Sequence, residues 1–320
     1  MILSKTPLRI SFAGGGSDYF NDLSQVNGRV IVSTIDKYLY VSINKKHNDH
    51  IRVSYSKTEN VHNSHQVKHE IIRESLKFYN IKNSLEVVTI ADIPSSGSGL
   101  ASSSALTVGL VNALRCYKGL KSTKNILAKD ACAIEREKCK KPIGMQDQYS
   151  TAYGGFNRIE FCNNTVKITK INLTKSRVDY FRNNLLLFHT GIARKADKIL
   201  GLIKKSGKQF QNYERLSYLA KHFEAELVGG DLLSCGEILH ESWMLKRNLN
   251  QNVSSLNLNN IYETAMKAGA RGGKILGAGG GGYFLFFVQP KFQKNLIKKL
   301  KKLQLINFNF SHDGSQLFKF

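Results

Sequence analysis

The segment IPSSGSGLASSSA, residues Ile93 to Ala105, joins a glycine- and serine-rich loop directly to an apolar stretch with helical spacing. The preceding run LEVVTIA, Leu85 to Ala91, is short and rich in β-branched residues, which favours a strand. From Ser102 to Tyr117 the apolar residues recur along one helical face. The sequence therefore predicts a strand, a glycine loop and a helix in immediate succession, an arrangement suited to holding phosphate.

Two glycines in this loop, Gly97 and Gly99, allow backbone conformations that other residues avoid and let the main chain approach a ligand closely. N–H groups in the first helical turn lack intrahelical partners, so an anion there gains roughly 0.3 to 1 kcal/mol from the helix dipole. A flexible turn with an ordinary serine N-cap is the alternative. The predicted phosphate-binding residues are Gly97, Ser98, Gly99, Leu100, Ala101, Ser102, Ser103 and Ser104. The P-loop order G-x-x-x-x-G-K-[ST] is absent, so a nucleotide would be held differently here.

Length and composition predict an ordinary globular protein. The 320 residues, 42% of them hydrophobic, suffice for a large core and indicate two domains or one two-lobed unit. No apolar run reaches the roughly 18 residues of a membrane-spanning helix, and the first residues show no secretory leader pattern. The five cysteines are scattered without a C-x-x-C pair, which indicates neither a disulfide framework nor a zinc knuckle. We expect a cytoplasmic protein.

The formal net charge of +23 would attract nucleic acid, anionic membranes or acidic small molecules. The lysines are spread along the chain, and the densest run, KKLKKL at 298–303, alternates with leucine as an amphipathic helix does. No zinc-finger, RNA-recognition or KH signature accompanies the charge. Three histidines, His62, His65 and His69, have helix-compatible spacing for a metal site, but their polar surroundings favour a loop that enters an exposed helix. We expect neither nucleic acid nor a membrane as the primary partner.

Runs typical of strands dominate the first 60 residues, whereas runs with helical period dominate after residue 195. A regular β-α alternation is absent, which favours an α+β fold over a doubly wound sheet. We expect a first lobe over 1–175 and a second, helix-rich lobe over 176–320. Besides 102–117, the predicted helices span 66–79, 122–138, 195–205, 213–228, 232–249, 256–268 and 292–303, and late strands are predicted at 283–288 and 305–310.

A second glycine-rich segment, GAGGGG from Gly277 to Gly282, precedes the predicted strand at 283–288. Consecutive glycines can form a tight turn where a helix and a strand pack closely. They can equally let the backbone lie against a ligand. The residues alone leave both interpretations open.

Three separated segments resemble the three motifs of the GHMP kinases, the superfamily of galactokinase, homoserine kinase, mevalonate kinase and phosphomevalonate kinase. They are TPLRISFAGGGSD (Thr6 to Asp18), IPSSGSGLASSSA and KILGAGGGGYF (Lys274 to Phe284). The resemblance spans nearly the whole chain. It implies a two-lobed α+β fold whose first lobe is similar to ribosomal protein S5 domain 2. It also implies that ATP, Mg²⁺ and an acceptor meet in the cleft between the lobes.

The resemblance further implies individual roles. Ser103 and Glu135 match the magnesium ligands of mevalonate-kinase-like members, with Glu137 as the competitor for Glu135. Asp147 matches the catalytic aspartate, and Arg9 matches a basic residue expected to orient Asp147 and to stabilise charge. Homoserine-kinase-like members lack this base, so direct deprotonation of the acceptor by Asp147 stays an expectation. Ala101 stands where the family often has glycine.

The motif combination looks most like the sugar-1-kinase branch of fucokinases and heptose-phosphate kinases, which implies a heptose 7-phosphate as acceptor. An unphosphorylated sugar such as L-fucose or galactose is the alternative, and a non-catalytic sensor or nucleic-acid-binding protein a distant one. A phosphorylated acceptor needs additional cationic groups, whereas Ser17 and Asp18 are suited to binding sugar hydroxyls. The predicted substrate-binding residues are Gly16, Ser17, Asp18, Arg194, Lys195, Arg271, Lys274, Gly279 and Gly280. The basic residues among them could instead form salt bridges or face ATP.

Overall fold

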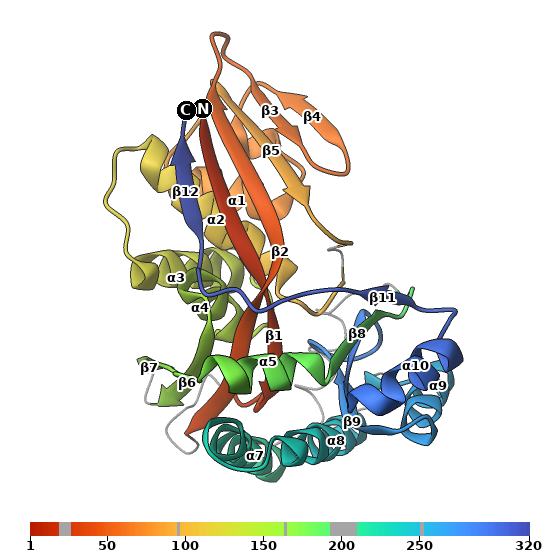
Figure 1. Cartoon of the computed structure of the whole chain (residues 1–320). Helices are drawn as coiled ribbons and strands as arrows, with labels where there is room; N and C mark the ends of the chain where they lie inside the picture. The colour runs from red at the N-terminus through yellow and green to blue at the C-terminus, as the bar shows by residue number, and fades with distance from the viewer. Residues whose placement is uncertain (19–26, 95–96, 163–164, 193–209, 250–252) are drawn as a thin grey trace.

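The chain folds around two β-sheets in the computed structural model, which describes residues 1–18, 27–94, 97–162, 165–192, 210–249 and 253–320. Within these ranges, one sheet has eight strands and the other has four. Helices pack on both sheets, and strands and helices do not alternate regularly (Figure 1). The predicted α+β fold class is confirmed.

The larger sheet has the order β12-β1-β2-β5-β3-β4, with β6 and β7 attached through β2. Its strands are β1 (Ile2–Ala13), β2 (Gly28–Lys45), β3 (Ile51–Ser54), β4 (Thr58–Val61), β5 (Leu85–Ala91), β6 (Phe156–Cys162), β7 (Thr165–Lys170) and β12 (Gln316–Lys319). The pairings are antiparallel except that of β3 with β5. The 18-residue strand β2 pairs with β6 through its first part and with β5 through its last part, so one long strand joins two portions of the sheet.

The helices of the first half are α1 (Glu70–Phe78), α2 (Ser102–Tyr117), α3 (Lys124–Cys132) and α4 (Gln146–Tyr153), with a short 3-10 turn at Ser64–Gln66 and a π-helical turn at Ala133–Lys138. Helix α2 packs against β1 and β2, and the predicted span 102–117 is confirmed. The helix predicted over 122–138 begins at an N-cap on Thr123 and changes to π-helical geometry at Ala133. Helix α4 was not predicted, because it has only eight residues and glycines lie close to both of its ends.

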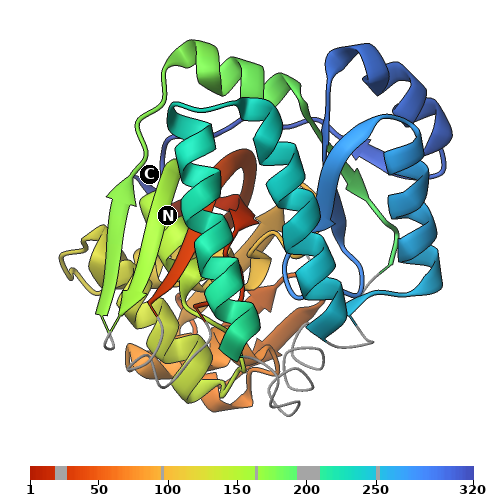
Figure 2. The ribbon, with the colours of Figure 1, turned by 90° about the horizontal axis from the view of Figure 1, so that it is seen from below.

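The smaller sheet has the order β11-β8-β10-β9, and all its pairings are antiparallel. Its strands are β8 (Leu185–His189), β9 (Ala270–Ile275), β10 (Tyr283–Val288) and β11 (Gln304–Ile306). The helices of the second half are α5 (Lys175–Asn183), α7 (Phe210–Val228), α8 (Leu232–Leu249), α9 (Leu256–Lys267) and α10 (Pro290–Lys299), of which α8 packs on β9 and α7 packs on β2 of the larger sheet. Helices α7 and α8 lie side by side (Figure 2). Helix α8 and strand β10 have the predicted bounds, whereas β11 is shorter than predicted. The helix predicted at 195–205 lies outside the described residues.

The last strand, β12, returns to the larger sheet and pairs with β1. The two termini therefore lie together at one end of the molecule (Figure 1). We propose the division at residue 175 as the boundary between the lobes, with β12 as a segment of the second half that completes the first sheet.

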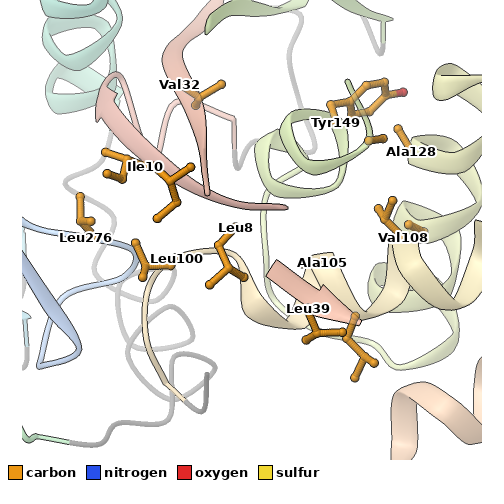
Figure 3. Packing of buried hydrophobic residues seen from close by; sticks show 14 of the residues in the cluster. Leu8, Ile10, Val32, Leu39, Leu100, Ala105, Val108, Ala128, Tyr149 and Leu276 are labelled. Carbon is orange, nitrogen blue, oxygen red and sulfur yellow. The ribbon is translucent and has the colours of Figure 1, made fainter. Parts of the chain in front are cut away.

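Buried apolar side chains from both sheets meet around β1. Leu8 and Ile10 of β1 pack with Leu100 from the glycine-serine loop and Leu276 from the end of β9 in one cluster (Figure 3). The ring of Phe12 lies 5.3 Å from that of Phe181 and 5.5 Å from that of Phe223, measured between centroids. This shared core fixes the end of β1 against the second half of the chain, and the functional residues lie directly beside it.

Candidate active site

The predicted phosphate loop connects β5 to α2. Gly97 and Gly99 have positive φ angles of 66° and 76°, as their loop positions require. The hydroxyl of the buried Ser98 accepts a hydrogen bond from Leu100 N–H at 3.1 Å and lies 2.6 Å from the Ser102 hydroxyl. These bonds fold the loop onto the first turn of α2, whose N–H groups lack intrahelical partners. The arrangement can bind an anion such as phosphate.

Ala101 is the N-cap residue of α2 and has left-handed backbone angles, with φ of 64° and ψ of 29°. A left-handed conformation costs a residue with a Cβ roughly 1 to 2 kcal/mol, whereas glycine adopts it freely. The structure therefore explains why glycine is frequent at this position of the motif. In this chain alanine occupies the strained position.

The second glycine-rich segment packs against the phosphate loop. A Cβ at Gly282 would come within 2.4 Å of the carbonyl oxygen of Ser98, so only glycine permits this approach. The hydroxyl of Thr190 donates to the Gly282 carbonyl at 2.9 Å and holds that end of the segment. Gly279 and Gly280 lie beside Val253, whose carbonyl accepts from Gly280 N–H at 2.7 Å. At Gly282 the structure therefore supports the packing interpretation.

Arg9 and Asp147 form a partly buried ion pair. Arg9 lies in β1 with a 2% exposed side chain, and Asp147 lies in the first turn of α4 with 28% of its side chain exposed. Arg9 donates from Nη1 to the carbonyl of Gly99 at 2.7 Å. It therefore links the phosphate loop to the carboxylate. Charge-assisted bonds of this kind are stronger than neutral ones and hold the carboxylate in one orientation.

The loop after β1 contains the predicted sugar ligands Gly16, Ser17 and Asp18. Ser17 is fully buried, and its hydroxyl lies within hydrogen-bond distance of the Gly14 and Arg29 carbonyls and of Arg29 N–H. Such a hydroxyl holds the loop closed, and we propose this role for Ser17 in place of sugar binding.

Asp18 is 2% exposed and joins its loop to α4. Its Oδ1 accepts from Gly16 N–H at 3.1 Å and from Gln146 Nε2 at 3.0 Å, and its Oδ2 accepts from Gln146 N–H at 3.1 Å. Burial raises the pKa of the Asp18 carboxyl, and the nearby charge of Asp147 adds to the increase. Asp18 thus holds the loop after β1 next to Asp147.

Glu135 is fully buried in the π-helical turn and lies beside Ser103 and Ser104. Its Oε1 accepts from the Ser103 hydroxyl, and its Oε2 accepts from the Ser104 hydroxyl at 2.7 Å and from Gln148 Nε2 at 2.6 Å. Burial raises the pKa of the Glu135 carboxyl, although the three hydrogen bonds oppose the increase. Glu137, the competitor of Glu135, is exposed.

The Ser103 and Glu135 pair fits a magnesium ion by its chemistry. A hydroxyl and a carboxylate are hard oxygen ligands, and Mg²⁺ in kinases binds few protein groups besides water and substrate phosphates. Ser103 is exposed at the start of the phosphate loop's helix, so its oxygen can face a nucleotide. The Ser104 hydroxyl points to Glu135 instead, and we propose that it supports this carboxylate and does not bind phosphate.

The four basic residues predicted for a distal phosphate differ in placement. Lys274 is 4% exposed on β9, and its ammonium donates to the Phe12 carbonyl at 2.9 Å, where the pairing of β1 with β2 shifts register. Burial lowers the pKa of Lys274 well below its ordinary value, and the charges of Lys246 and Arg9 add to the decrease. Arg271 is exposed and forms a 2.6 Å ion pair with Glu237, which agrees with the salt-bridge alternative. Arg194 and Lys195 lie outside the described residues.

Two residues at the site were not predicted, Gln146 and Gln148. They flank Asp147 in the sequence QDQ and contact Asp18 and Glu135, respectively. The signal that could have found them is helical phase, because consecutive helical residues point in directions about 100° apart and reach different neighbours. Because no helix was predicted at 146–153, the directions of these side chains could not be predicted either.

The described ranges contain no cluster of three or more His, Cys, Asp or Glu side chains that could hold a metal. None of their helices is long and apolar enough to cross a membrane.

An anion-binding loop next to an oriented carboxylate suits the transfer of a phosphoryl group to a hydroxyl, which is the reaction of kinases. The chain belongs to the GHMP kinases: the family's N-terminal domain matches residues 63–155, and its C-terminal domain matches residues 222–303. It is an ATP-dependent sugar kinase, because its relatives include sugar kinases along the whole chain.

The D-glycero-alpha-D-manno-heptose 7-phosphate kinase of Campylobacter jejuni is 32% identical over 98% of this chain and 97% of its own length. Among solved structures, a D-glycero-D-manno-heptose 1-phosphate kinase from Bacteroides thetaiotaomicron has a TM-score of 0.82 at 24% identity, over 100% of this chain and 99% of that one. Lactococcus lactis galactokinase with galactose has a TM-score of 0.76 at 17% identity, over 98% and 95% of the two chains. The two structural likenesses show the fold.

Proposed function

We propose that this kinase transfers the γ-phosphoryl group of ATP to the anomeric hydroxyl of D-glycero-D-manno-heptose 7-phosphate. The observation that supports this acceptor best is the 32% identity, over nearly the full length of both chains, to a heptose 7-phosphate kinase. The product would be the 1,7-bisphosphate, which the family resemblance connects to the synthesis of nucleotide-activated heptose.

Asp147 accepts the proton of the attacking hydroxyl. Arg9 holds one oxygen of this carboxylate and also donates to the phosphate loop at Gly99, so it places the base in a fixed position relative to the bound phosphates. The guanidinium group of Arg9 supplies positive charge that stabilises the transition state. The remaining catalytic power comes from positioning, as is usual for phosphoryl transfer.

Gly97 to Ser103, at the start of α2, would bind the phosphates of ATP. Ser103 and Glu135 would hold Mg²⁺, which would neutralise charge on the phosphate oxygens. The buried Ser104 and Gln148 both donate to Oε2 of Glu135.

The acceptor lies between Asp147 and the loop at Gly14 to Asp18. Of the four basic residues considered for its distal phosphate, Lys274 is buried and bonded to the Phe12 carbonyl, and Arg271 is paired with Glu237 at the surface. We therefore retain Arg194 and Lys195 as the candidates and leave Lys274 and Arg271 out.

An unphosphorylated sugar is the second candidate acceptor. The ion pair of Arg271 with Glu237 favours it, because it removes one cation from the set that a distal phosphate would need.

Mg²⁺-dependent release of ADP from ATP distinguishes these acceptors. The panel contains D-glycero-D-manno-heptose 7-phosphate, the unphosphorylated heptose, L-fucose, galactose and mevalonate. We expect turnover with the heptose 7-phosphate alone. Turnover confined to an unphosphorylated sugar would retain the kinase and overturn the proposed acceptor.

The distal phosphate has its own test. Replacing Arg194 and Lys195 together by alanine should raise the KM for the sugar phosphate while the KM for ATP stays constant. An unchanged KM for the sugar phosphate would exclude both residues as its ligands.

A further inference from the structure

The first turn of α4 sends three consecutive side chains to three different parts of the site. Asp147 binds Arg9 of β1. Gln146 contacts Asp18 in the loop after β1. Gln148 contacts Glu135 in the π-helical turn. Their directions differ because each helical residue is rotated by about 100° from the one before it. One helical turn therefore carries the proposed base, Asp147, and also contacts both the loop after β1 and the carboxylate of Glu135.

Gln148 binds one of the two carboxylate oxygens of Glu135, so only the other oxygen could bind a metal ion. The carboxylate oxygen Oε2 accepts from both Ser104 and Gln148, which occupies its two lone pairs. Among the described residues, only Ser103, an exposed serine, donates to Oε1, so one lone pair of this oxygen has no donor there. Gln148 is fully buried, and its own Oε1 has no hydrogen-bond partner in the described structure. Burial of a glutamine with an unsatisfied oxygen is costly, which indicates that its amide group serves a purpose other than stability.

Gln146 has a separate set of partners. Its Nε2 donates to Asp18 Oδ1 at 3.0 Å, and its Oε1 accepts from the Ser11 hydroxyl at 2.8 Å. Both partners belong to β1 or to the loop that follows it. Within the described part of the chain, Gln146 forms no hydrogen bond with Glu135 or Ser103.

We propose that Gln146 and Gln148 are positioning residues with separable tasks: Gln148 orients Glu135 for the metal ion, and Gln146 holds the acceptor loop against the helix of Asp147. This inference rests on the proposed function, since it presupposes a metal bound at Glu135 and an acceptor beside Asp18. Partners that orient a metal ligand typically influence metal affinity by about 10- to 100-fold.

The matched variants Gln148→Met and Gln146→Met test the proposal. Methionine has nearly the length of glutamine but cannot donate these bonds. Two quantities are measured for each variant, the Mg²⁺ concentration at half-maximal rate and the KM for the acceptor, and melting temperatures show whether each variant folds. We expect Gln148→Met to raise the Mg²⁺ requirement about tenfold with the acceptor KM changed less than about twofold, and Gln146→Met to do the reverse.

Two further measurements keep the test decisive. Ser104→Ala removes the other donor to Oε2 from a different helix, so it should raise the Mg²⁺ requirement in the same direction even if Gln148→Met fails to fold. Calorimetric binding of a non-hydrolysable ATP analogue, with and without Mg²⁺, reads metal affinity without turnover. It therefore tests Gln148 even if every acceptor in the panel is inactive, which would be a failure of the proposed function alone.

The proposal is overturned by either of two results. One is an unchanged Mg²⁺ requirement in both Gln148→Met and Ser104→Ala. The other is a proportional change of both quantities in both glutamine variants, which would indicate general damage to α4 in place of separate tasks.

Discussion

Arg9 donates two hydrogen bonds to one and the same oxygen of Asp147, from Nε at 2.9 Å and from Nη2 at 2.6 Å. The other carboxylate oxygen, Oδ2, receives no hydrogen bond from Arg9, and under the proposed function it accepts the proton of the acceptor hydroxyl. Because Nη1 of Arg9 binds the Gly99 carbonyl, the pair also fixes the distance between Asp147 and the loop before α2.

Replacement of Asp147 by asparagine should lower kcat by about 10²- to 10⁴-fold, the usual contribution of a positioned general base. Nucleotide affinity should change little, because the phosphate loop stays intact. Steady-state kinetics and calorimetric binding of the ATP analogue measure both quantities. A kcat near that of the wild type would show that the acceptor loses its proton without this carboxylate.

Ala101→Gly should stabilise the protein by about 0.5 to 1 kcal/mol. The substitution removes the left-handed strain of roughly 1 to 2 kcal/mol, and the greater freedom of glycine in the unfolded chain offsets about 0.5 to 1 kcal/mol of this gain. Ala105→Gly in the ordinary helical part of α2 is the control and should destabilise by at least about 1 kcal/mol, because Ala105 is also fully buried. Urea unfolding compares the two variants, and the strain argument fails if both lose stability equally.

Glu135→Gln should stabilise the metal-free protein at neutral pH while it abolishes activation by Mg²⁺. Burial raises the pKa of Glu135 in the folded state, so the stability linked to this group is present below its ordinary pKa and is lost as the pH rises through the folded value. A glutamine does not ionise, so the variant does not lose this stability as the pH rises. Melting temperatures of the two proteins without Mg²⁺ should converge near about pH 4 and separate above it. A less stable variant at neutral pH would contradict this account.

Lys274→Met should also stabilise the protein, with the opposite dependence on pH. The pKa of Lys274 is lowered in the folded state, so its stability is complete above the ordinary pKa of 10.5 and is lost as the pH falls through the folded value. The melting temperature of Lys274→Met should therefore exceed that of the wild type most at low pH, and the difference should shrink toward about pH 10. Lys274→Arg, which keeps the charge, serves as the control and should not show this gain. A difference that does not vary with pH would exclude the titration of Lys274 as its cause.

The local parts of the site were predictable because their chemistry lies in contiguous residues. Glycine and serine spacing predicted a loop between β5 and α2, and the apolar period of residues 102–117 predicted the helix that follows it; the structure confirms both elements. Helix α4 escaped prediction, and the positions of Gln146 and Gln148 with it. Its eight residues are too few, and too close to glycines, for a periodic pattern to stand out.

The α+β class, the glycine- and serine-rich loop before α2 and the resemblance to a kinase family could be read from the residues alone, because each depends on residue types at short spacing. Which distant groups meet depends on the tertiary fold. Arg9 and Asp147 are 138 residues apart, and Lys274 reaches a carbonyl 262 residues away. Such pairs depend on strand register and on helical phase, and a shift of one residue in either would turn the side chain away from its partner. For the same reason the structure, and not the pattern of charges, separated the buried Lys274 from Arg271 on the same strand.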